Sequence, residues 1–311
     1  MTRERIIIDT DPGVDDAMAI LFALNSPEVD VEGLTVVHGN TEVEYCCKNA
    51  LRILEVAGRS DIPVAKGIGR PLIREPRWGK QIHGTNGLGD VELGEPNVSA
   101  IEEHAVDFII RKVMQNPKDI TLVAIGPLTN VAVALLKEPR VANSVKQIVF
   151  MGGAITVPGN ASPVASANLY HDPESARIVF SSGAPIVMAG LDVARKLVFT
   201  ESYINEFREG KTPAAQFIAK VSTTCYLECY SKRLGQVAYQ SNDTPTLGYL
   251  IAPELYRTRR LFVDIETRGE LTSGETVADL LNQFGREPNV DVCLELEAEK
   301  LREVFMDRVA R

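Results

Sequence analysis

Short apolar runs alternate with amphipathic stretches along almost the whole of the 311-residue chain. The apolar runs are rich in Ile, Val and Leu, as expected for strands that are buried on both faces of a parallel sheet. This alternation predicts an α/β fold with an open, mostly parallel sheet and helices on both faces. The expected strands are Arg5–Ile8, Val31–Val37, Ile120–Ile125, Gln147–Phe150, Ile186–Met188 and Leu261–Ile265, and the expected helices are Asp16–Leu24, Val43–Ala57, Ala100–Met114, Val131–Leu136, Pro173–Ser181 and Ala214–Lys232.

Two long segments interrupt this alternation of apolar and amphipathic stretches. Gly67–Asn97 is rich in Gly, Pro and Arg and holds the single Trp, and Gly152–Asp172 is rich in Gly, Ala, Ser, Pro and Asn. Long loops in a compact domain are usually functional or mobile. No linker or internal repeat divides the chain, so we expect a single domain over residues 1–311.

Composition narrows the function classes. The hydrophobic content of 45% suffices for a large core, and the formal charge of −9 argues against nucleic acid and anionic membranes as partners. The first expected strand begins too early for a signal peptide, and no apolar run approaches membrane-spanning length. The five cysteines are an odd, sparse set that suits a reducing compartment. We therefore expect a cytoplasmic protein.

An acidic turn at Asp9–Asp16 is the most informative feature of the sequence. Four aspartates stand within eight residues, between an apolar strand and an apolar helical run. Helix capping explains one or two of them. It does not explain Asp9 and Asp11, which precede Pro12-Gly13 at the end of a buried strand. Crowded carboxylates repel one another, and a hard divalent cation with oxygen ligands removes that cost. The turn therefore predicts a metal or catalytic site.

The same turn, Asp9-Thr-Asp11-Pro-Gly-Val-Asp15-Asp16-Ala, resembles the signature of the nucleoside hydrolases, the inosine–uridine-preferring N-ribohydrolases. The resemblance spans nearly the whole chain and implies a Rossmann-like fold that assembles into homodimers or homotetramers. It also implies a nucleoside as substrate, cut into free nucleobase and ribose during nucleoside catabolism and salvage. Further matching segments are His38-Gly39-Asn40, His83–Gly89, Ile125–Asn130, Met151–Ala154, Gly159-Asn160, Asn168 with Asp172-Pro173, and Asp243.

The resemblance implies a Ca²⁺ ion at the floor of the pocket. Its protein ligands would be the carboxylates of Asp11, Asp16 and Asp243 and the backbone carbonyl of Ile125. Carboxylates and a carbonyl suit the oxygen-rich shell of Ca²⁺ and leave positions for a ribose diol and a water. By the same resemblance, Asp11 would take the proton of that water as general base.

The resemblance also names the residues that bind the sugar. Asp15 and Asn40 resemble those that hold the ribose hydroxyls, Asn160 and Asn168 resemble those at its far side, and Met151 resembles a sugar-packing methionine. Cleavage of the C–N bond builds positive charge on the ribose, as in glycoside hydrolysis. A pocket rich in carboxylates stabilises such charge. Asn168 could instead be a helix cap, and Met151 could be plain core.

Two positions depart from the family pattern. Many members have a His before the last ligand, which protonates the leaving base, but this chain has Asn242, whose amide releases no proton at neutral pH. His83 is the best remaining candidate for the acid, and a solvated surface His is an equal alternative. Ser166 replaces a Glu that receives the ribose 5′-hydroxyl, so recognition of the 5′ position should be weaker or different. Trp78 is either a base-stacking residue or a latch for its loop.

Two other functions compete with a Ca²⁺-dependent nucleosidase. A haloacid-dehalogenase-type phosphatase also places Asp-x-Asp after its first strand, although it lacks the Pro-Gly-Val-Asp-Asp continuation. A nucleoside or ribose binder of low activity would explain Asn242 and Ser166. Release of phosphate, release of base, or binding without turnover distinguishes the three.

Overall fold

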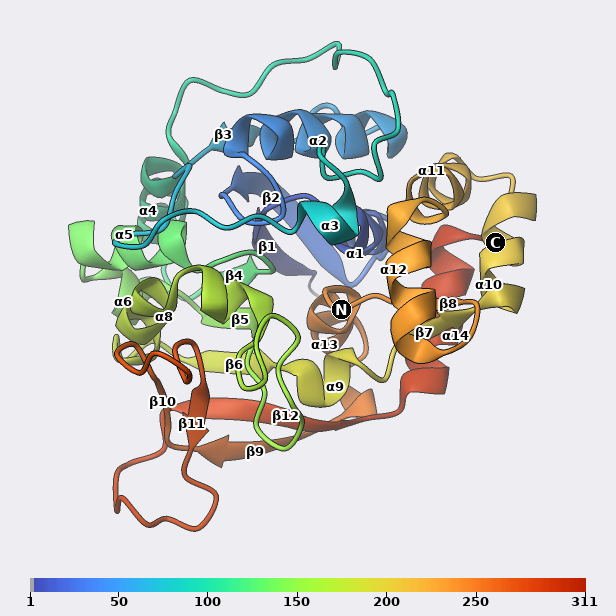
Figure 1. Cartoon of the computed structure of the whole chain (residues 1–311). Coiled ribbons are helices and arrows are strands. Elements are labelled where there is room, and N and C mark those ends of the chain that lie inside the picture. Colours follow the sequence, from blue (N-terminus) through green and yellow to red (C-terminus); the bar gives the residue numbers. More distant parts are fainter. Residues whose placement is uncertain (1–2) are drawn as a thin grey trace.

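A computed structural model describes residues 3–311 and shows one eight-stranded sheet between two sets of helices (Figure 1). The strand order is β3-β2-β1-β4-β5-β6-β12-β9, and every neighbouring pair is parallel except β12–β9. The expected α/β class is confirmed. Its strands are β1 (Glu4–Thr10), β2 (Val29–Val36), β3 (Val64–Lys66), β4 (Ile120–Ala124), β5 (Gln147–Met151), β6 (Ile186–Ala189), β9 (Tyr256–Leu261) and β12 (Val290–Leu296).

The helices follow the strands in turn, and four short strands form two small extra sheets, β7–β8 and β10–β11. The helices are α1 (Val14–Leu24), α2 (Val43–Val56), α3 (Lys80–His83), α4 (Ala105–Gln115), α5 (Thr129–Lys137), α6 (Val141–Ser144), α7 (Ala167–His171), α8 (Pro173–Phe180), α9 (Leu191–Ala194), α10 (Glu201–Glu209), α11 (Pro213–Ser222), α12 (Cys225–Leu234), α13 (Thr244–Ile251) and α14 (Ala298–Val309), with a 3₁₀ turn at Pro253–Leu255. The extra strands are β7 (Val198–Thr200), β8 (Ala238–Gln240), β10 (Val263–Ile265) and β11 (Thr276–Ala278).

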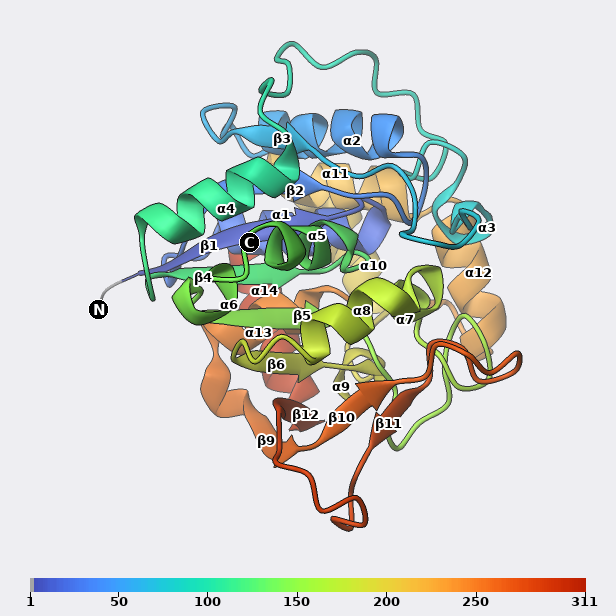
Figure 2. The same ribbon diagram turned by 90° about the vertical axis from the view of Figure 1, so that its left-hand side faces the viewer.

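Both faces of the sheet are buried, which explains why its strands are apolar at consecutive positions. In β1, Ile6 and Ile8 pack into the core beneath α1, α13 and α14, whereas Ile7 packs into the core beneath α4, α5 and α8. All three side chains are 0% exposed. Figures 1 and 2 show α4, α5, α6 and α8 on one side of the sheet and α13 and α14 on the other. No helix among residues 3–311 is both long and apolar enough to cross a membrane.

Three expected elements have different limits in the structure. The stretch Ala214–Lys232 forms two helices, because Thr223 and Thr224 at the break donate their hydroxyls to backbone carbonyls. The stretch Leu261–Ile265 is divided between β9 and β10, since the Asn289 side chain bonds both backbone groups of Val263 and draws it out of the main sheet. The helix expected from Ala100 begins at Ala105, where the His104 side chain accepts from the Val106 N–H.

The sequence analysis missed β12, which lies inside the main sheet between β6 and β9. Its sequence, Val-Asp-Val-Cys-Leu-Glu-Leu, alternates with period two, and that signal could have revealed it. The short strand β3 and the helices α10, α13 and α14 were also missed. Of these, α13 matters most for function, because Asp243 stands at its N-cap.

Candidate active site and metal centre

The candidate site lies at the carboxyl edge of the sheet, where the strand order reverses. β1 has β2 on one side and β4 on the other, with Asp9 opposite both Thr35 and Ala124. Three adjacent strands therefore lead to site residues at one edge: β1 leads to Asp11, β2 to Asn40 and β4 to Ile125. Such a switch point is where open α/β sheets bind ligands.

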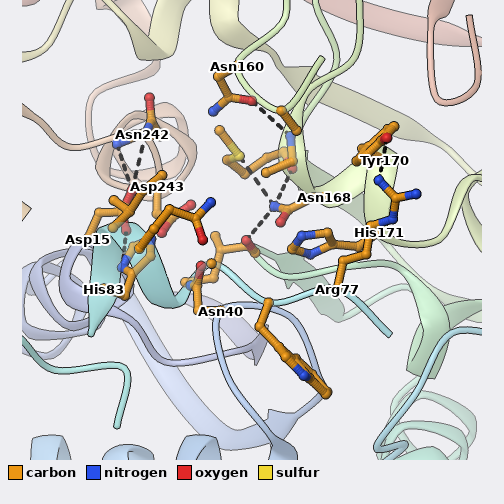
Figure 3. A pocket seen from close by; sticks show the side chains of 18 of the residues that line it. Asp15, Asn40, Arg77, His83, Asn160, Asn168, Tyr170, His171, Asn242 and Asp243 are labelled. Carbon is orange, nitrogen blue, oxygen red and sulfur yellow. Dashed lines mark hydrogen bonds and ion pairs between the residues drawn. The ribbon is translucent and has the colours of Figure 1, made fainter. Parts of the chain in front are cut away.

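A cavity of about 390 Å³ opens at this edge (Figure 3). It collects side chains from the turn after β1, from both long loops and from the segment before α13. The predicted site residues that line it are Asp15, Asn40, His83, Ile125, Met151, Asn160, Asn168, Asn242 and Asp243. These residues span more than two hundred positions of the chain, yet the structure brings them around one cavity.

Asp11 and Asp16 lie directly behind Asn40 and are almost fully buried, 1% and 0% exposed. The Asn40 backbone N–H donates to Asp11 Oδ2 at 2.7 Å, and its side-chain Nδ2 donates to Asp16 Oδ2 at 2.9 Å. Asp16 also accepts from the Gly13 N–H at the start of α1 and from the Thr10 hydroxyl. Asp16 therefore caps α1, which agrees with the expectation that helix capping explains one or two of the four aspartates.

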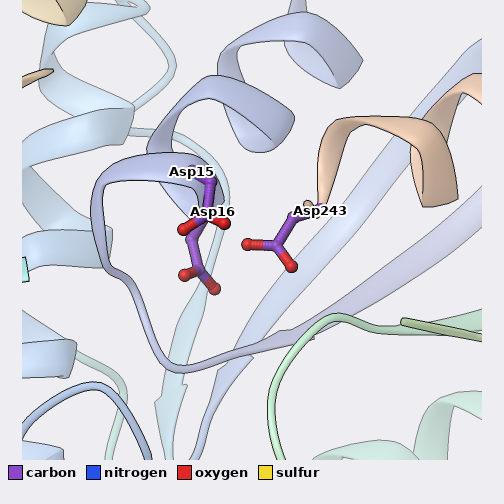
Figure 4. Close-up of side chains that lie close together, drawn as sticks. All are labelled: Asp15, Asp16 and Asp243. Atoms are coloured by element: carbon purple, nitrogen blue, oxygen red, sulfur yellow. The ribbon is translucent and has the colours of Figure 1, made fainter. Parts of the chain in front are cut away.

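One oxygen each of Asp15, Asp16 and Asp243 lie within 4.8 Å of one another, and all three residues are buried (Figure 4). Asp243 stands at the N-cap of α13, but its carboxylate accepts no capping hydrogen bond. The sequence analysis grouped Asp11 with Asp16 and Asp243 as ligands. In the structure, Asp15 completes the tightest group instead, and Asp11 stands beside it.

The charge of this cluster is not compensated by protein. Burial raises the pKa of Asp11 well above its usual range, and repulsion from Asp16 raises it further. Burial and the three neighbouring aspartates do the same to the pKa of Asp243. Within residues 3–311 no Lys or Arg side chain pairs with these carboxylates, and Asp11 Oδ1 is buried with no hydrogen-bond donor. Buried carboxylates without a counter-charge are costly, and a divalent cation with oxygen ligands fits this arrangement.

Two glycines allow the backbone to approach Asp11 closely. A Cβ at Gly126 would stand 2.7 Å from Asp11 Oδ1, and one at Gly39 would clash with Asp11 Oδ2. Both contacts would be shorter than any normal carbon–oxygen contact. The two glycines therefore set the position of the Asp11 carboxylate.

We expect Gly126→Ala to displace the Asp11 carboxylate and lower catalytic activity by about 100-fold, the scale for a misplaced catalytic group. The folded structure should persist, since the added methyl meets the side chains of Asp11 and Val37 rather than backbone. Activity and thermal unfolding of the purified variant check this. Near wild-type activity would show that the position of Asp11 does not matter.

His83 is buried, and its side chain binds the backbone of the acidic turn. Its Nδ1 accepts from the Val14 N–H at 3.1 Å, so its proton is on Nε2. Burial lowers the pKa of His83 to about 4, and the ring is neutral at pH 7. This arrangement favours His83 as a hydrogen-bond donor to a ligand, and it does not favour the predicted role of proton-delivering acid or the alternative of a solvated surface residue.

The structure also places Asn242 and Ser166, the two positions that depart from the family pattern. Asn242 Nδ2 donates to the Tyr230 hydroxyl at 2.7 Å, and its backbone N–H donates to Asp15 Oδ2 at 3.2 Å. Ser166 is 0% exposed, lies outside the cavity lining and accepts the Gly153 N–H at 2.7 Å with its Oγ. Ser166 is therefore not placed to bind substrate, because its hydroxyl is already held within the loop.

Several residues that line the cavity were missed by the sequence analysis. His171 is buried and its Nδ1 has no hydrogen-bond partner. It follows Asn168 by three positions in α7, a helical spacing that could have revealed it. Arg77 and Arg233 line the mouth, and no local sequence pattern distinguishes them from other surface arginines. Trp78 lines the mouth as well, edge-on to His38 with 6.5 Å between ring centroids.

Comparison with known proteins decides the family. Residues 6–303 match the model of the inosine-uridine preferring nucleoside hydrolases. A probable uridine nucleosidase 1 from Oryza sativa subsp. japonica is 39% identical over 278 residues, 89% of this chain and 85% of that protein. The chain belongs to the nucleoside hydrolase family.

Solved structures of nucleoside hydrolases agree with this assignment. The plant nucleoside hydrolase PpNRh1 superposes with a TM-score of 0.95 at 34% identity, covering 99% of both chains. A purine-preferring ribonucleoside hydrolase from Gardnerella vaginalis gives a TM-score of 0.92 at 33% identity, covering 98% of both. The expected family and its α/β fold are confirmed, and this nucleoside hydrolase is a hydrolase of N-glycosyl bonds. A phosphatase of the haloacid-dehalogenase type finds no support.

Proposed function

We propose that this nucleoside hydrolase cleaves a ribonucleoside into nucleobase and ribose in a Ca²⁺-dependent reaction, with Asp11 as general base. The observation that carries the proposal is the buried, uncompensated carboxylate cluster at the switch point of the sheet. Its chemistry suits a hard cation and an oxygen-rich sugar. The family assignment supplies the reaction class, and the residues of this chain supply the details below.

The ligands of the ion would be the carboxylates of Asp11, Asp16 and Asp243 and the carbonyl oxygen of Ile125, with Asp15 beside them. Bound there, Ca²⁺ supplies a chelating centre for a vicinal diol and lowers the pKa of a bound water. The Ile125 carbonyl already accepts from Asn168 Nδ2 at 2.6 Å, and its second lone pair remains available.

Asp11 is suited to receive a proton. Its Oδ2 is fixed by the Asn40 N–H, and its Oδ1 is unpartnered, so one oxygen is oriented and the other is free. A general base contributes most when it is held within hydrogen-bond reach of the water and its position does not change. Asn40 and the two glycines provide that rigidity.

The remaining side chains orient the sugar. Asn168 Nδ2 donates to the carbonyls of Ile125 and Met151, which leaves the amide oxygen for a ribose hydroxyl. Asn160 accepts the Ala167 N–H with its Oδ1 and offers its amide N–H groups to the cavity. As the C–N bond breaks, the aspartates stabilise positive charge on the ribose where it develops.

The leaving base is activated by hydrogen bonds rather than by proton transfer from a strong acid. A neutral His83 can donate without releasing a proton readily, whereas the Asn242 amide already donates to Tyr230 and Asp15. We expect Asn242→His to raise kcat about tenfold or more for nucleosides whose bases leave poorly, because general acid catalysis becomes available. The gain should be absent in Asn242→Gln, which keeps an amide. Equal rates for both variants across substrates would reject this account of the leaving group.

One experiment tests the proposed function directly. Purified protein is incubated with a panel of purine and pyrimidine nucleosides, with Ca²⁺ or with a chelator, and the products are separated by chromatography. The proposal requires free base and ribose in the Ca²⁺ samples. Release of phosphate from phosphorylated substrates without base release would indicate a phosphatase, and calorimetric binding without products would indicate a binder.

A further inference from the structure

One histidine in the cavity wall has no role in the reaction as described so far. His171 is buried and lines the main cavity, and its Nδ1 has no hydrogen-bond partner within residues 3–311. Burial and the positive charge of nearby Arg77 lower the pKa of His171 to about 4, so the ring is neutral at pH 7. A neutral imidazole carries one N–H donor and one acceptor. His171 therefore brings hydrogen-bonding capacity to the cavity wall.

The surroundings of the ring decide which nitrogen of His171 meets a ligand. Because Nδ1 is fully enclosed, Nε2 is the ring nitrogen that can reach the cavity. A proton on Nδ1 would be a buried donor without an acceptor, which costs the free energy of an unmade hydrogen bond. The proton is therefore favoured on Nε2, and His171 is a donor toward the cavity.

Asn168 supplies the complementary acceptor. It precedes His171 by three positions in α7, the spacing at which side chains are neighbours on one helix face. Its Nδ2 donates to the carbonyls of Ile125 and Met151, so its Oδ1 is the group left for a ligand. A hydroxyl between the two residues would donate to Asn168 Oδ1 and accept from His171 Nε2. The pair thus matches both hydrogen-bonding functions of one hydroxyl.

The geometry of the substrate identifies this hydroxyl. In a ribonucleoside C1′ carries the base and C4′ carries C5′, and the carbons of the 2′,3′-diol join these two ends of the ring. With the diol on the aspartates and the base beside His83 and Asn242, C5′ points to the opposite wall. Figure 3 shows the His171 ring beside Asn168 and across the cavity from His83 and Asn242. The 5′-hydroxyl is therefore the group that meets His171.

We infer that His171 donates a hydrogen bond to the 5′-hydroxyl of the substrate and thereby selects ribonucleosides over 5′-deoxynucleosides. This inference rests on the proposed function, because it takes the diol to lie on the aspartates and the base beside His83 and Asn242. It does not involve Ser166, whose hydroxyl is held by the Gly153 N–H. A donor that is already buried and neutral binds a neutral hydroxyl without the cost of desolvating a charge.

The test compares inosine and uridine with their 5′-deoxy analogues. For each enzyme the ratio of kcat/KM on the nucleoside to that on the analogue is measured, so that losses from folding cancel. The wild-type ratio should be about ten, the scale of one buried hydrogen bond left unmade. His171→Leu removes the donor and should lower the ratio to about one. His171→Gln, whose amide N–H can take the place of Nε2, should keep part of the preference.

Tyr170→Phe is the matched control. Tyr170 is the preceding residue of α7 and also lines the cavity, but its hydroxyl is engaged by Arg77. Loss of that hydroxyl should leave the ratio unchanged. A fall of the ratio in Tyr170→Phe but not in His171→Leu would assign the 5′-hydroxyl to Tyr170 and contradict the inference.

A wild-type ratio near one, or a ratio that His171→Leu leaves unchanged, overturns the inference, while base release from the nucleosides leaves the proposed function standing. Calorimetry in Ca²⁺ with methyl β-ribofuranoside and its 5-deoxy derivative decides the contact even if no substrate is cleaved. The wild type should bind the 5-hydroxy sugar about tenfold tighter, and His171→Leu should bind both equally. Equal affinities in the wild type overturn the inference alone, and binding of neither sugar overturns the proposed function with it.

Discussion

Replacing Asp11 by Asn should lower kcat for base release by about 10³-fold, within the usual range for loss of general acid–base catalysis. Asn keeps the shape of the side chain and an oxygen for the Asn40 N–H, but it cannot accept the proton of a water. Asp11→Ala should lose as much or more, several kcal/mol of transition-state stabilisation. Steady-state assays with a good substrate measure the change.

The stability of the same variant separates a catalytic role from a structural one. Burial and repulsion raise the pKa of Asp11, so its ionised form destabilises the metal-free fold at neutral pH. Metal-free Asp11→Asn should therefore unfold at the same temperature as the wild type or higher. Asp61→Asn, which loses only an exposed ion pair with Arg59, should leave activity unchanged and alter stability little. Wild-type turnover in Asp11→Asn, or loss of activity only through unfolding, would exclude Asp11 as the base.

Chelation should abolish base release and lower the melting temperature at pH 7.5, and Ca²⁺ should restore both. A ligand present at 100 times its Kd stabilises by about 2.7 kcal/mol, which for a chain of this size raises the melting temperature by about 5 °C. Differential scanning calorimetry with and without Ca²⁺ measures the shift. Asp243→Asn, which removes one expected ligand, should reduce it.

The pH dependence of that shift has a predictable sign. The pKa values of Asp11 and Asp243 are raised in the metal-free fold, so their contribution favours folding at acid pH and is lost as pH rises through those pKa values. Ca²⁺ binds the ionised carboxylates and displaces their protons. The gain in melting temperature from Ca²⁺ should therefore be larger at pH 7.5 than at pH 5. A gain that is constant or larger in acid would contradict a carboxylate site.

Much of the fold was predictable because its strands are buried on both faces. β1, β2, β4, β5 and β6 were each anticipated within a few residues, since short uninterrupted apolar runs between helical stretches are typical of buried parallel strands. The edge region was harder to predict. There Asn289 divides the stretch Leu261–Ile265 between two sheets through side-chain hydrogen bonds that no periodicity reveals. β12 was missed although its alternation of polar and apolar residues is a strand signal.

The residues of the site were predictable, but the directions in which their side chains point were not. Carboxyl ends of adjacent parallel strands meet at one edge, which is why Asp11, Asn40 and Ile125 could be expected together. Neighbours such as Asp15 and Asp16 leave the first turn of α1 at different angles, and their spacing does not reveal that both approach Asp243. The burial of Ser166 was not predictable either, because its hydroxyl accepts a hydrogen bond from Gly153 in another part of the same loop.

The central claim is that the aspartate cluster holds a divalent cation on which the sugar is bound. Crystals grown with Ca²⁺ and ribose, with diffraction measured at a long wavelength where Ca²⁺ scatters anomalously, test it most directly. The account predicts one anomalous peak in contact with Asp11, Asp16, Asp243 and the Ile125 carbonyl, with ribose hydroxyls completing its shell. An absence of anomalous density at these carboxylates in saturating Ca²⁺, or a peak bound elsewhere, would contradict it.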